Sequence, residues 1–165
     1  MAGHLSGKNI AVTGAGNGIG RSVAILCAKE GANVVVADYG VELDGSAPSS
    51  AVADEVVNQI KELGGNAIAV AGDVSESEVG QRIVETAIEA WGRIDGVACA
   101  AGILRERMLF NMTDEEFDDV VRVHLRGHFN VYRAASAVMR KQEGGGSILG
   151  FTSGAFVAST AQPNY

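Results

Sequence analysis

Residues 9–20 read NIAVTGAGNGIG, an apolar run followed by a turn rich in glycine. The apolar run predicts a short strand, and the helical spacing of the residues after the turn predicts a helix. Gly14, Gly18 and Gly20 give the spacing G-x-x-x-G-x-G, because Ile19 stands where G-x-G-x-x-G needs its third glycine. The backbone N–H groups of such a turn, together with the positive end of the helix, suit a phosphate group.

A carboxylate follows at a defined distance from this turn. Asp38 lies 18 residues after Gly20 and ends a second valine-rich strand over residues 33–38. An acidic side chain at that place suits hydrogen bonds to the ribose hydroxyls of NAD and repels the 2′-phosphate of NADP. Asn17 supplies no positive charge that would favour NADP. The alternative is that the glycines only build a structural turn.

The rest of the chain alternates between strand and helix patterns. The Ser75–Glu78 and Thr113–Glu116 pairs predict capping boxes at the starts of two helices, and the stretch 41–50 is expected to be a solvated surface loop. This alternation predicts an α/β fold, a doubly wound Rossmann-type parallel sheet in a single NAD-binding domain over residues 1–165. The predicted strands are 9–14, 33–38, 66–74, 96–100 and 147–151, and the predicted helices are 18–31, 51–65, 75–91 and 113–141.

Composition excludes several classes of function. The 165 residues include 13 basic and 20 acidic side chains, giving a formal net charge of −7 without any basic run. Nucleic acid and anionic membrane surfaces are therefore not expected partners. Cys27 and Cys99 lie far apart in apolar runs, which predicts two buried free thiols. No stretch is typical of a signal peptide or a membrane span, so we expect a cytoplasmic protein.

A second class of enzyme shares the predicted fold. Methyltransferases that use S-adenosylmethionine also carry a glycine turn after the first strand, and Gly14, Gly16 and Gly18 would supply G-x-G-x-G. Their pattern needs an acidic residue shortly before the first glycine, whereas this chain has Ala11, Val12 and Thr13. This alternative is the weaker one.

The glycine turn, Asp38, the Gly-Asp-Val stretch at 72–74 and the final Ser and Tyr together resemble the short-chain dehydrogenase/reductase family. The resemblance covers about residues 8–165. It implies that Asp73 and Val74 hold the adenine ring. The family's Asn-Asn-Ala-Gly signature is replaced by Cys99-Ala100-Ala101-Gly102, which keeps only the close-approach glycine. The implied cofactor-binding residues are Gly14, Asn17, Gly18, Ile19, Gly20, Asp38, Asp73, Val74, Ala100 and Gly102.

Residues 102–135 resemble more closely the dehydrogenase part of peroxisomal multifunctional enzymes and their bacterial relatives. Those enzymes oxidise 3-hydroxyacyl-CoA or related alcohols, so a hydroxyacyl thioester or a steroid is the expected class of substrate. His124 stands where most family members have an asparagine that serves a proton relay. His124 and His128 also have the i, i+4 spacing of two metal ligands, but Arg126 and Gly127 occupy the place of a catalytic Glu, and we predict no metal site.

The resemblance assigns Tyr165 as the acid/base residue of hydride transfer. A free phenol has a pKa near 10, and the family lowers it with a lysine four residues later, beyond the last residue of this sequence. Counting from the fifth strand makes Ser153 the substrate-polarising hydroxyl, whereas counting back from Tyr165 gives Thr152. We prefer Ser153; the alternative is that both only cap a turn.

Two further expectations follow from where the sequence stops. A fifth strand at 147–151 would be an exposed apolar edge, so we expect the chain to be part of a larger polypeptide with further strands. The complete protein is expected to form a homo-oligomer, a dimer or a tetramer, through the helix that begins at Thr113. The competing hypothesis is a catalytically inert NAD-binding module.

Overall fold

The computed structural model describes residues 3–41, 45, 49, 51–157 and 161–165. Its strands form one parallel sheet in the order β3-β2-β1-β4-β5. The chain leaves β1 toward β2 on one side and returns on its other side with β4, so the loops after β1 and β4 diverge and leave a crevice between them. The predicted doubly wound α/β fold is confirmed. The strands are β1 (Asn9–Thr13), β2 (Asn33–Asp38), β3 (Asn66–Ala71), β4 (Gly96–Cys99) and β5 (Ser147–Gly150).

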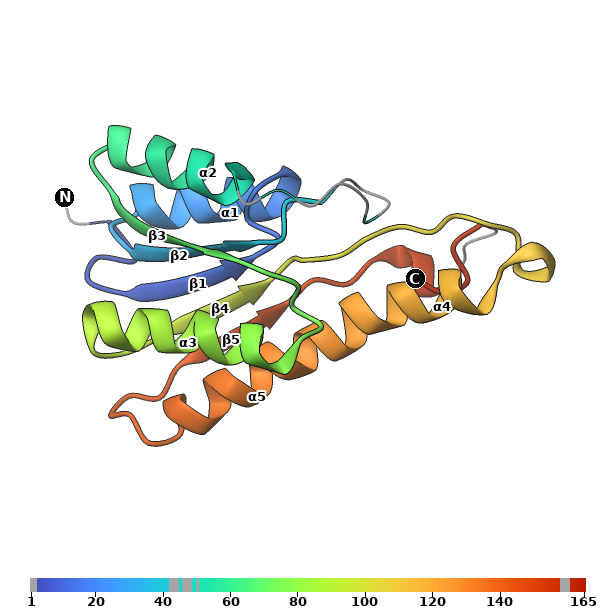
Figure 1. Ribbon diagram of the computed structural model, residues 1–165. Helices are drawn as coiled ribbons and strands as arrows, with labels where there is room; N and C mark the ends of the chain where they lie inside the picture. Colours follow the sequence, from blue (N-terminus) through green and yellow to red (C-terminus); the bar gives the residue numbers. More distant parts are fainter. Residues whose placement is uncertain (1–2, 42–44, 46–48, 50, 158–160) are drawn as a thin grey trace.

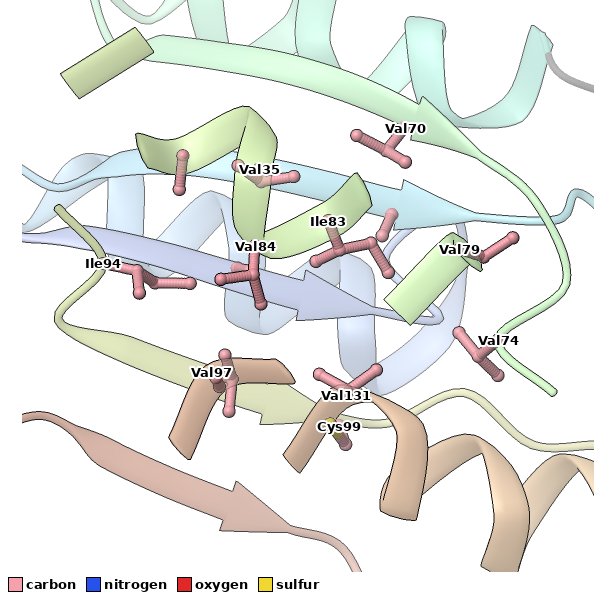
Figure 2. Packing of buried hydrophobic residues seen from close by; sticks show 14 of the residues in the cluster. Val35, Val70, Val74, Val79, Ile83, Val84, Ile94, Val97, Cys99 and Val131 are labelled. Carbon is pink, nitrogen blue, oxygen red and sulfur yellow. The ribbon is translucent and has the colours of Figure 1, made fainter. Parts of the chain in front are cut away.

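Helices cover both faces of this sheet (Figure 1). On one side lie α1 (Gly18–Lys29) and α2 (Ala51–Glu62), and on the other lie α3 (Ser77–Trp91) and α5 (Gly127–Met139). Alternate residues of β2 supply the two cores: Val34 and Val36 pack toward α1 and α2, whereas Val35 packs toward α3 and α5. Figure 2 shows the second of these cores, where Val35, Val84, Val97 and Val131 converge. Such two-sided burial explains why the inner strands read as continuous apolar runs.

The helix predicted to begin at Thr113 is continuous but not uniform. Its capping box is confirmed: the Thr113 hydroxyl accepts a hydrogen bond from the Glu116 amide at 3.2 Å, and the Glu116 carboxylate accepts one from the Thr113 amide at 3.0 Å. After α4 (Asp114–Val121) comes one π-helical stretch, η2 (Arg122–Arg126), which leads into α5. Such π-bulges are rare and occur frequently at functional sites. His124 lies at the middle of this one.

The predicted capping box at Ser75 and Glu78 is wrong. The helix α3 begins at Ser77, and its N-cap residue Glu76 makes no side-chain capping bond. Ser75 has other partners: its amide donates to Asp73 at 2.8 Å, and its hydroxyl accepts from Arg122 at 2.5 Å. The Ser75 hydroxyl, which the local sequence predicted as a helix cap, therefore bonds to the distant Arg122 instead.

The two cysteines differ in burial. Both thiols are free, but Cys99 is buried and Cys27 is only half-buried, so the prediction of two buried thiols holds for Cys99 alone. Burial raises the pKa of the Cys99 thiol to about 12, against a hydrogen bond with Thr13 that lowers it. Cys99 is therefore an inert part of the core.

The last strand differs from the other four. All four residues of β5 are exposed, including Ile148 at 41% and Leu149 at 54%, as expected for an apolar edge. That residues 1–165 form a single domain stays a prediction. Within the ranges that the structure describes, no helix has both the length and the apolar character to cross a bilayer.

Candidate active site

A cavity of about 530 Å³ lies at the carboxyl ends of β1, β2, β3 and β4. Its position follows from the topology, since this is the edge of the sheet where the two halves diverge. Every residue that the sequence assigned to the cofactor lies in its wall. These residues are Gly14, Asn17, Gly18, Ile19, Gly20, Asp38, Asp73, Val74, Ala100 and Gly102. The structure therefore brings together four segments that are separated by up to about 90 residues.

The three glycines of the turn have different reasons to be glycine. Gly14 has a φ of +63°, and a Cβ added there would lie 2.7 Å from the backbone of Ala101. A Cβ on Gly20 would lie 2.0 Å from the Gly14 carbonyl oxygen. Gly18 also has a positive φ, +53°, but a Cβ there would meet no heavy atom within 4 Å. Gly14 and Gly20 thus permit packing, whereas Gly18 leaves open space beside the cavity.

The start of α1 presents backbone N–H groups at this open space. Asn17, its N-cap residue, makes no side-chain capping bond, and the first turn contains no acidic residue. The first N–H groups of a helix have no partner within the helix, and the helix dipole favours an anion there. These features fit the pyrophosphate of a dinucleotide.

Asp38 lines the cavity and also anchors the backbone at two places, Gly16 and Gly40. One carboxylate oxygen accepts a hydrogen bond from the Gly16 amide at 2.7 Å, and the other accepts one from the Gly40 amide at 2.5 Å. The side chain is half-buried, and each oxygen retains a further lone pair. Sequence reasoning predicted this residue as a ribose ligand, which stays a prediction, and missed its role as an anchor of the glycine turn.

Asp73 is held by an arginine that the sequence did not single out. Arg122 of η2 pairs with the Asp73 carboxylate at 2.7 Å. Partial burial raises the pKa of Asp73, but hydrogen bonds from Ser75 and Arg122 and the charge of Arg122 outweigh it and hold that pKa below its usual value. Arg122 also lies 3.6 Å from Asp119, which pairs with Arg105 at 3.3 Å. Arg105, Asp119 and Arg122 all line the cavity. Only the Asp119–Arg122 pair has a local spacing, i, i+3; the Arg122–Asp73 and Arg105–Asp119 pairs join different elements and have no spacing signal.

The imidazole of His124 lies directly against Gly102. A Cβ on Gly102 would come 2.1 Å from the His124 ring, so this glycine makes room for the histidine as well as lining the cavity. The Nε2 atom of His124 is 2.9 Å from the Ile103 carbonyl oxygen and 3.2 Å from the Ile103 amide nitrogen, so either tautomer finds a partner. Burial lowers the pKa of His124, although the Ile103 backbone raises it and His128 lowers it further. This lowered pKa favours the neutral form of the ring.

The Tyr165 ring contacts the His124 ring, whereas the Ser153 hydroxyl bonds to a different neighbour. The Tyr165 and His124 rings meet edge to face, with their centroids 4.7 Å apart, and Tyr165 is 41% exposed. The Ser153 hydroxyl accepts from the Ala155 amide at 3.3 Å and caps the short helix η3 (Gly154–Phe156), while Thr152 is exposed. In the part of the chain that the structure describes, Ser153 has no hydrogen bond to Tyr165.

The other histidine points to a different neighbour. The ring of His128 packs edge to face on Tyr132 at 5.6 Å, and its buried Nε2 has no partner among the residues described. Across the same ranges, no three His, Cys, Asp or Glu side chains are grouped as metal ligands would be.

The segment after β2, which includes the stretch 41–50 expected to be a solvated loop, also takes part in the cavity. Tyr39, Val41 and Gly45 line it, and a Cβ on Gly45 would lie 3.3 Å from the Ile103 side chain. The segment after β2 therefore lies against the segment after β4, and the solvated loop stays a prediction. Residues 42–44, 46–48 and 50 fall outside the described ranges.

Comparison with known proteins identifies this architecture. A family model described as short chain dehydrogenase matches residues 8–165. This chain belongs to the short-chain dehydrogenase family. The methyltransferase interpretation is therefore wrong: a glycine turn followed by an acid is common to both classes. The short-chain dehydrogenase family generally uses a nicotinamide cofactor.

Individual relatives agree with this family. The chain is 42% identical over 161 residues to peroxisomal multifunctional enzyme type 2 from Mus musculus, covering 98% of this chain and 22% of that protein. It is 46% identical over 149 residues to hydroxyacyl-CoA dehydrogenase ChsB1 from Mycobacterium tuberculosis, covering 88% and 45%. A crystal structure of a short chain dehydrogenase from Mycobacterium avium superposes with a TM-score of 0.90 at 42% identity, covering 99% of this chain and 60% of that one. The chain thus spans less than two thirds of each of these relatives.

Proposed function

We propose that this short-chain dehydrogenase is NAD-dependent and transfers a hydride between a secondary alcohol or its ketone and nicotinamide. The observation that carries the proposal is that the Asp38 carboxylate and the start of α1 line the same cavity. Asn17, the N-cap residue of α1, makes no side-chain capping bond. NAD, when bound, would supply the hydride acceptor or donor. The turn around Gly18 would hold its pyrophosphate, and Asp73 and Val74 would hold its adenine ring.

The charges of the cavity wall favour NAD over NADP. Asp38 keeps free lone pairs for ribose hydroxyls and would repel a phosphate at the same position. The two lining arginines are already committed, since Arg105 pairs with Asp119 and Arg122 pairs with Asp73. Neither offers the uncompensated positive charge that a 2′-phosphate requires.

The proton would be exchanged at the Tyr165 hydroxyl, as the family resemblance implies. A neutral His124, in contact with the Tyr165 ring, would relay the proton through its imidazole. Ser153 would orient and polarise the substrate oxygen once it leaves its bond with the Ala155 amide. We propose a hydroxyacyl thioester as the substrate, a class supported by the name of the mycobacterial relative, hydroxyacyl-CoA dehydrogenase ChsB1, and keep a steroid alcohol as the second candidate.

An inert NAD-binding module is the alternative function. It shares every cofactor contact and differs only in that Tyr165 exchanges no proton. Turnover of a 3-hydroxyacyl-CoA with NAD by this 165-residue chain would exclude the alternative.

We also propose that the complete protein is a homo-oligomer in the cytoplasm. Phe117, Leu125 and Phe129 are 46%, 70% and 55% exposed along α4, η2 and α5, which supports a second copy as their cover. The cytoplasmic location stays a prediction, since the names of several relatives include the word peroxisomal.

The cofactor proposal is tested by calorimetric titration of the chain with NAD and with NADP. The wild type should bind NAD and discriminate against NADP. In Asp38→Asn, loss of a charged hydrogen-bond acceptor is worth about 1.5–3 kcal/mol, so NAD affinity should fall roughly 10- to 100-fold. NADP affinity should stay the same or rise.

The matched control is Asp54→Asn, which removes the same charge from an exposed position on α2. It should leave both affinities unchanged. Thermal unfolding of both variants separates loss of binding from loss of the turn that Asp38 anchors. Equal affinity of wild type and Asp38→Asn for NAD would overturn the assignment.

A further inference from the structure

The residues before Tyr165 form a turn that is tied to a distant segment. The Tyr165 amide donates to the Gln162 carbonyl at 3.2 Å, which closes a β-turn with Pro163 at its second position. Just before the turn, the Ala161 carbonyl accepts from the Arg107 amide at 2.8 Å. In Figure 1 the C-terminus lies beside α4 accordingly. The turn is thus docked on the chain between β4 and α4.

Asn164 makes the main connection. Its side-chain Nδ2 donates to the Arg105 carbonyl at 3.1 Å and to the Glu116 carbonyl at 2.9 Å, and the residue is only 9% exposed. These carbonyls lie 59 and 48 residues away, one in the segment after β4 and one in α4. Because both partners are acceptors, only the NH₂ group can face them. An aspartate of the same shape could not replace it.

The contact of Tyr165 depends on this connection. Tyr165 is 41% exposed, so its own ring is only partly enclosed, and its ring contact is the edge of His124. The backbone that carries the ring is fixed one residue earlier, at Asn164. We propose that Asn164 is the positioning residue for Tyr165, holding its ring against His124 by clamping the turn to two distant backbone carbonyls. This inference rests on the proposed role of Tyr165 in proton exchange.

A role in positioning also accounts for an unfavourable feature of Asn164. Its Oδ1 is buried and has no partner in the ranges that the structure describes. An unpartnered buried acceptor costs free energy, and an apolar side chain would avoid that cost. The side-chain amide of Asn164 is the group that donates hydrogen bonds to the Arg105 and Glu116 carbonyls at once.

The first test is nuclear magnetic resonance of the 165-residue chain without cofactor. The His124 ring protons, assigned with His124→Asn, lie beside the Tyr165 ring and report its ring-current field. Tyr165→Leu should shift them and sets the reference. Asn164→Ala and Asn164→Asp should move them at least halfway to that reference. Asn111→Ala changes an exposed residue of the chain between β4 and α4. It should leave the His124 resonances unchanged. Wild-type His124 resonances in both Asn164 variants, or in Tyr165→Leu, would overturn the inference.

The second test separates positioning from cofactor binding. In the Asn164→Asp chain, the affinity for NAD should stay within twofold of wild type, because the substitution changes no side chain of the cavity wall. In the complete protein, Asn164→Asp should lower kcat for hydride transfer at least tenfold and leave the KM for NAD unchanged. A parallel loss of NAD affinity would show that the turn supports the whole cavity and would contradict a role specific to Tyr165. A wild type that binds no NAD would instead defeat the proposed function and leave the resonance test intact.

Discussion

The ends of β1 and β5 lead to the two halves of the candidate site, and they are built in opposite ways. The last three residues of β1 are buried between two neighbouring strands, and the glycine turn after it packs on the Ala101 backbone and is anchored by Asp38. β5 is exposed at the edge of the sheet, and the turn that carries Tyr165 beyond it is held through the Asn164 side chain on backbone carbonyls of other segments. The half with the glycine turn therefore follows a buried inner strand, whereas the half with Tyr165 follows an exposed edge strand and depends on a side-chain clamp.

The largest effect is expected from breaking the local geometry itself. Gly14→Ala would force a side chain into a positive φ and place its Cβ 2.7 Å from the Ala101 backbone. The left-handed conformation costs about 1–2 kcal/mol and overpacking about 1–3 kcal/mol. We expect the free energy of unfolding to fall by about 3 kcal/mol, measured by urea denaturation, with loss of NAD binding.

Gly92→Ala is the control that separates these two costs. Gly92 ends α3 with a φ of +78°, and a Cβ there would meet no atom within 4 Å. Only the conformational cost of about 1–2 kcal/mol should appear. Equal destabilisation by both substitutions would contradict the close packing of the turn on the segment after β4.

A middle-sized effect is expected where the two halves are joined. Arg122 holds Asp73 from η2, which also carries His124. Since the Arg122 side chain is 43% exposed, Arg122→Ala should cost about 1 kcal/mol or less of stability. The pKa of Asp73 should rise toward 3.8, measured by titrating its side-chain carbon signal.

The sign of the pH dependence follows from the lowered pKa of Asp73. Its stabilising contribution is present above the unfolded value near 3.8 and is lost as the pH falls through the lower folded value. Arg122→Ala should therefore weaken the loss of stability below pH 4. Arg122→Lys keeps the charge and should retain part of the dependence. An unchanged acid profile in Arg122→Ala would mean that the Ser75 amide alone holds the carboxylate.

The smallest effect is expected from titrating His124. Burial lowers its pKa below 6.5, so the unfolded chain binds a proton first. Stability should fall as the pH drops below about 6.5, and this loss should be complete below the folded pKa. Histidine resonances followed against pH measure the folded value, and His124→Asn should remove this part of the pH dependence. A midpoint at or above 6.5 would contradict the buried placement of the ring.

Sequence reasoning found the elements and the glycine turn because each is a local pattern. The strand Asn33–Asp38 matches its prediction, as does the capping box at Thr113. It failed at Ser75, because the hydroxyl that reads as a helix cap is taken by Arg122, 47 residues later. It also missed the π-helical stretch around His124, which the apolar spacing of a continuous helix does not reveal.

The sequence by itself determined the strands, the helices and ten residues of the cavity wall, because strand, turn and helix signals act over a few neighbouring residues. Only the tertiary structure decided that Gly102 makes room for His124, that Arg122 holds Asp73, and that Asn164 ties the Tyr165 turn to carbonyls 48 and 59 residues away. These contacts join groups that lie on different elements of the fold. Such partners have no fixed spacing along the chain and exist only once the sheet has brought its loops together.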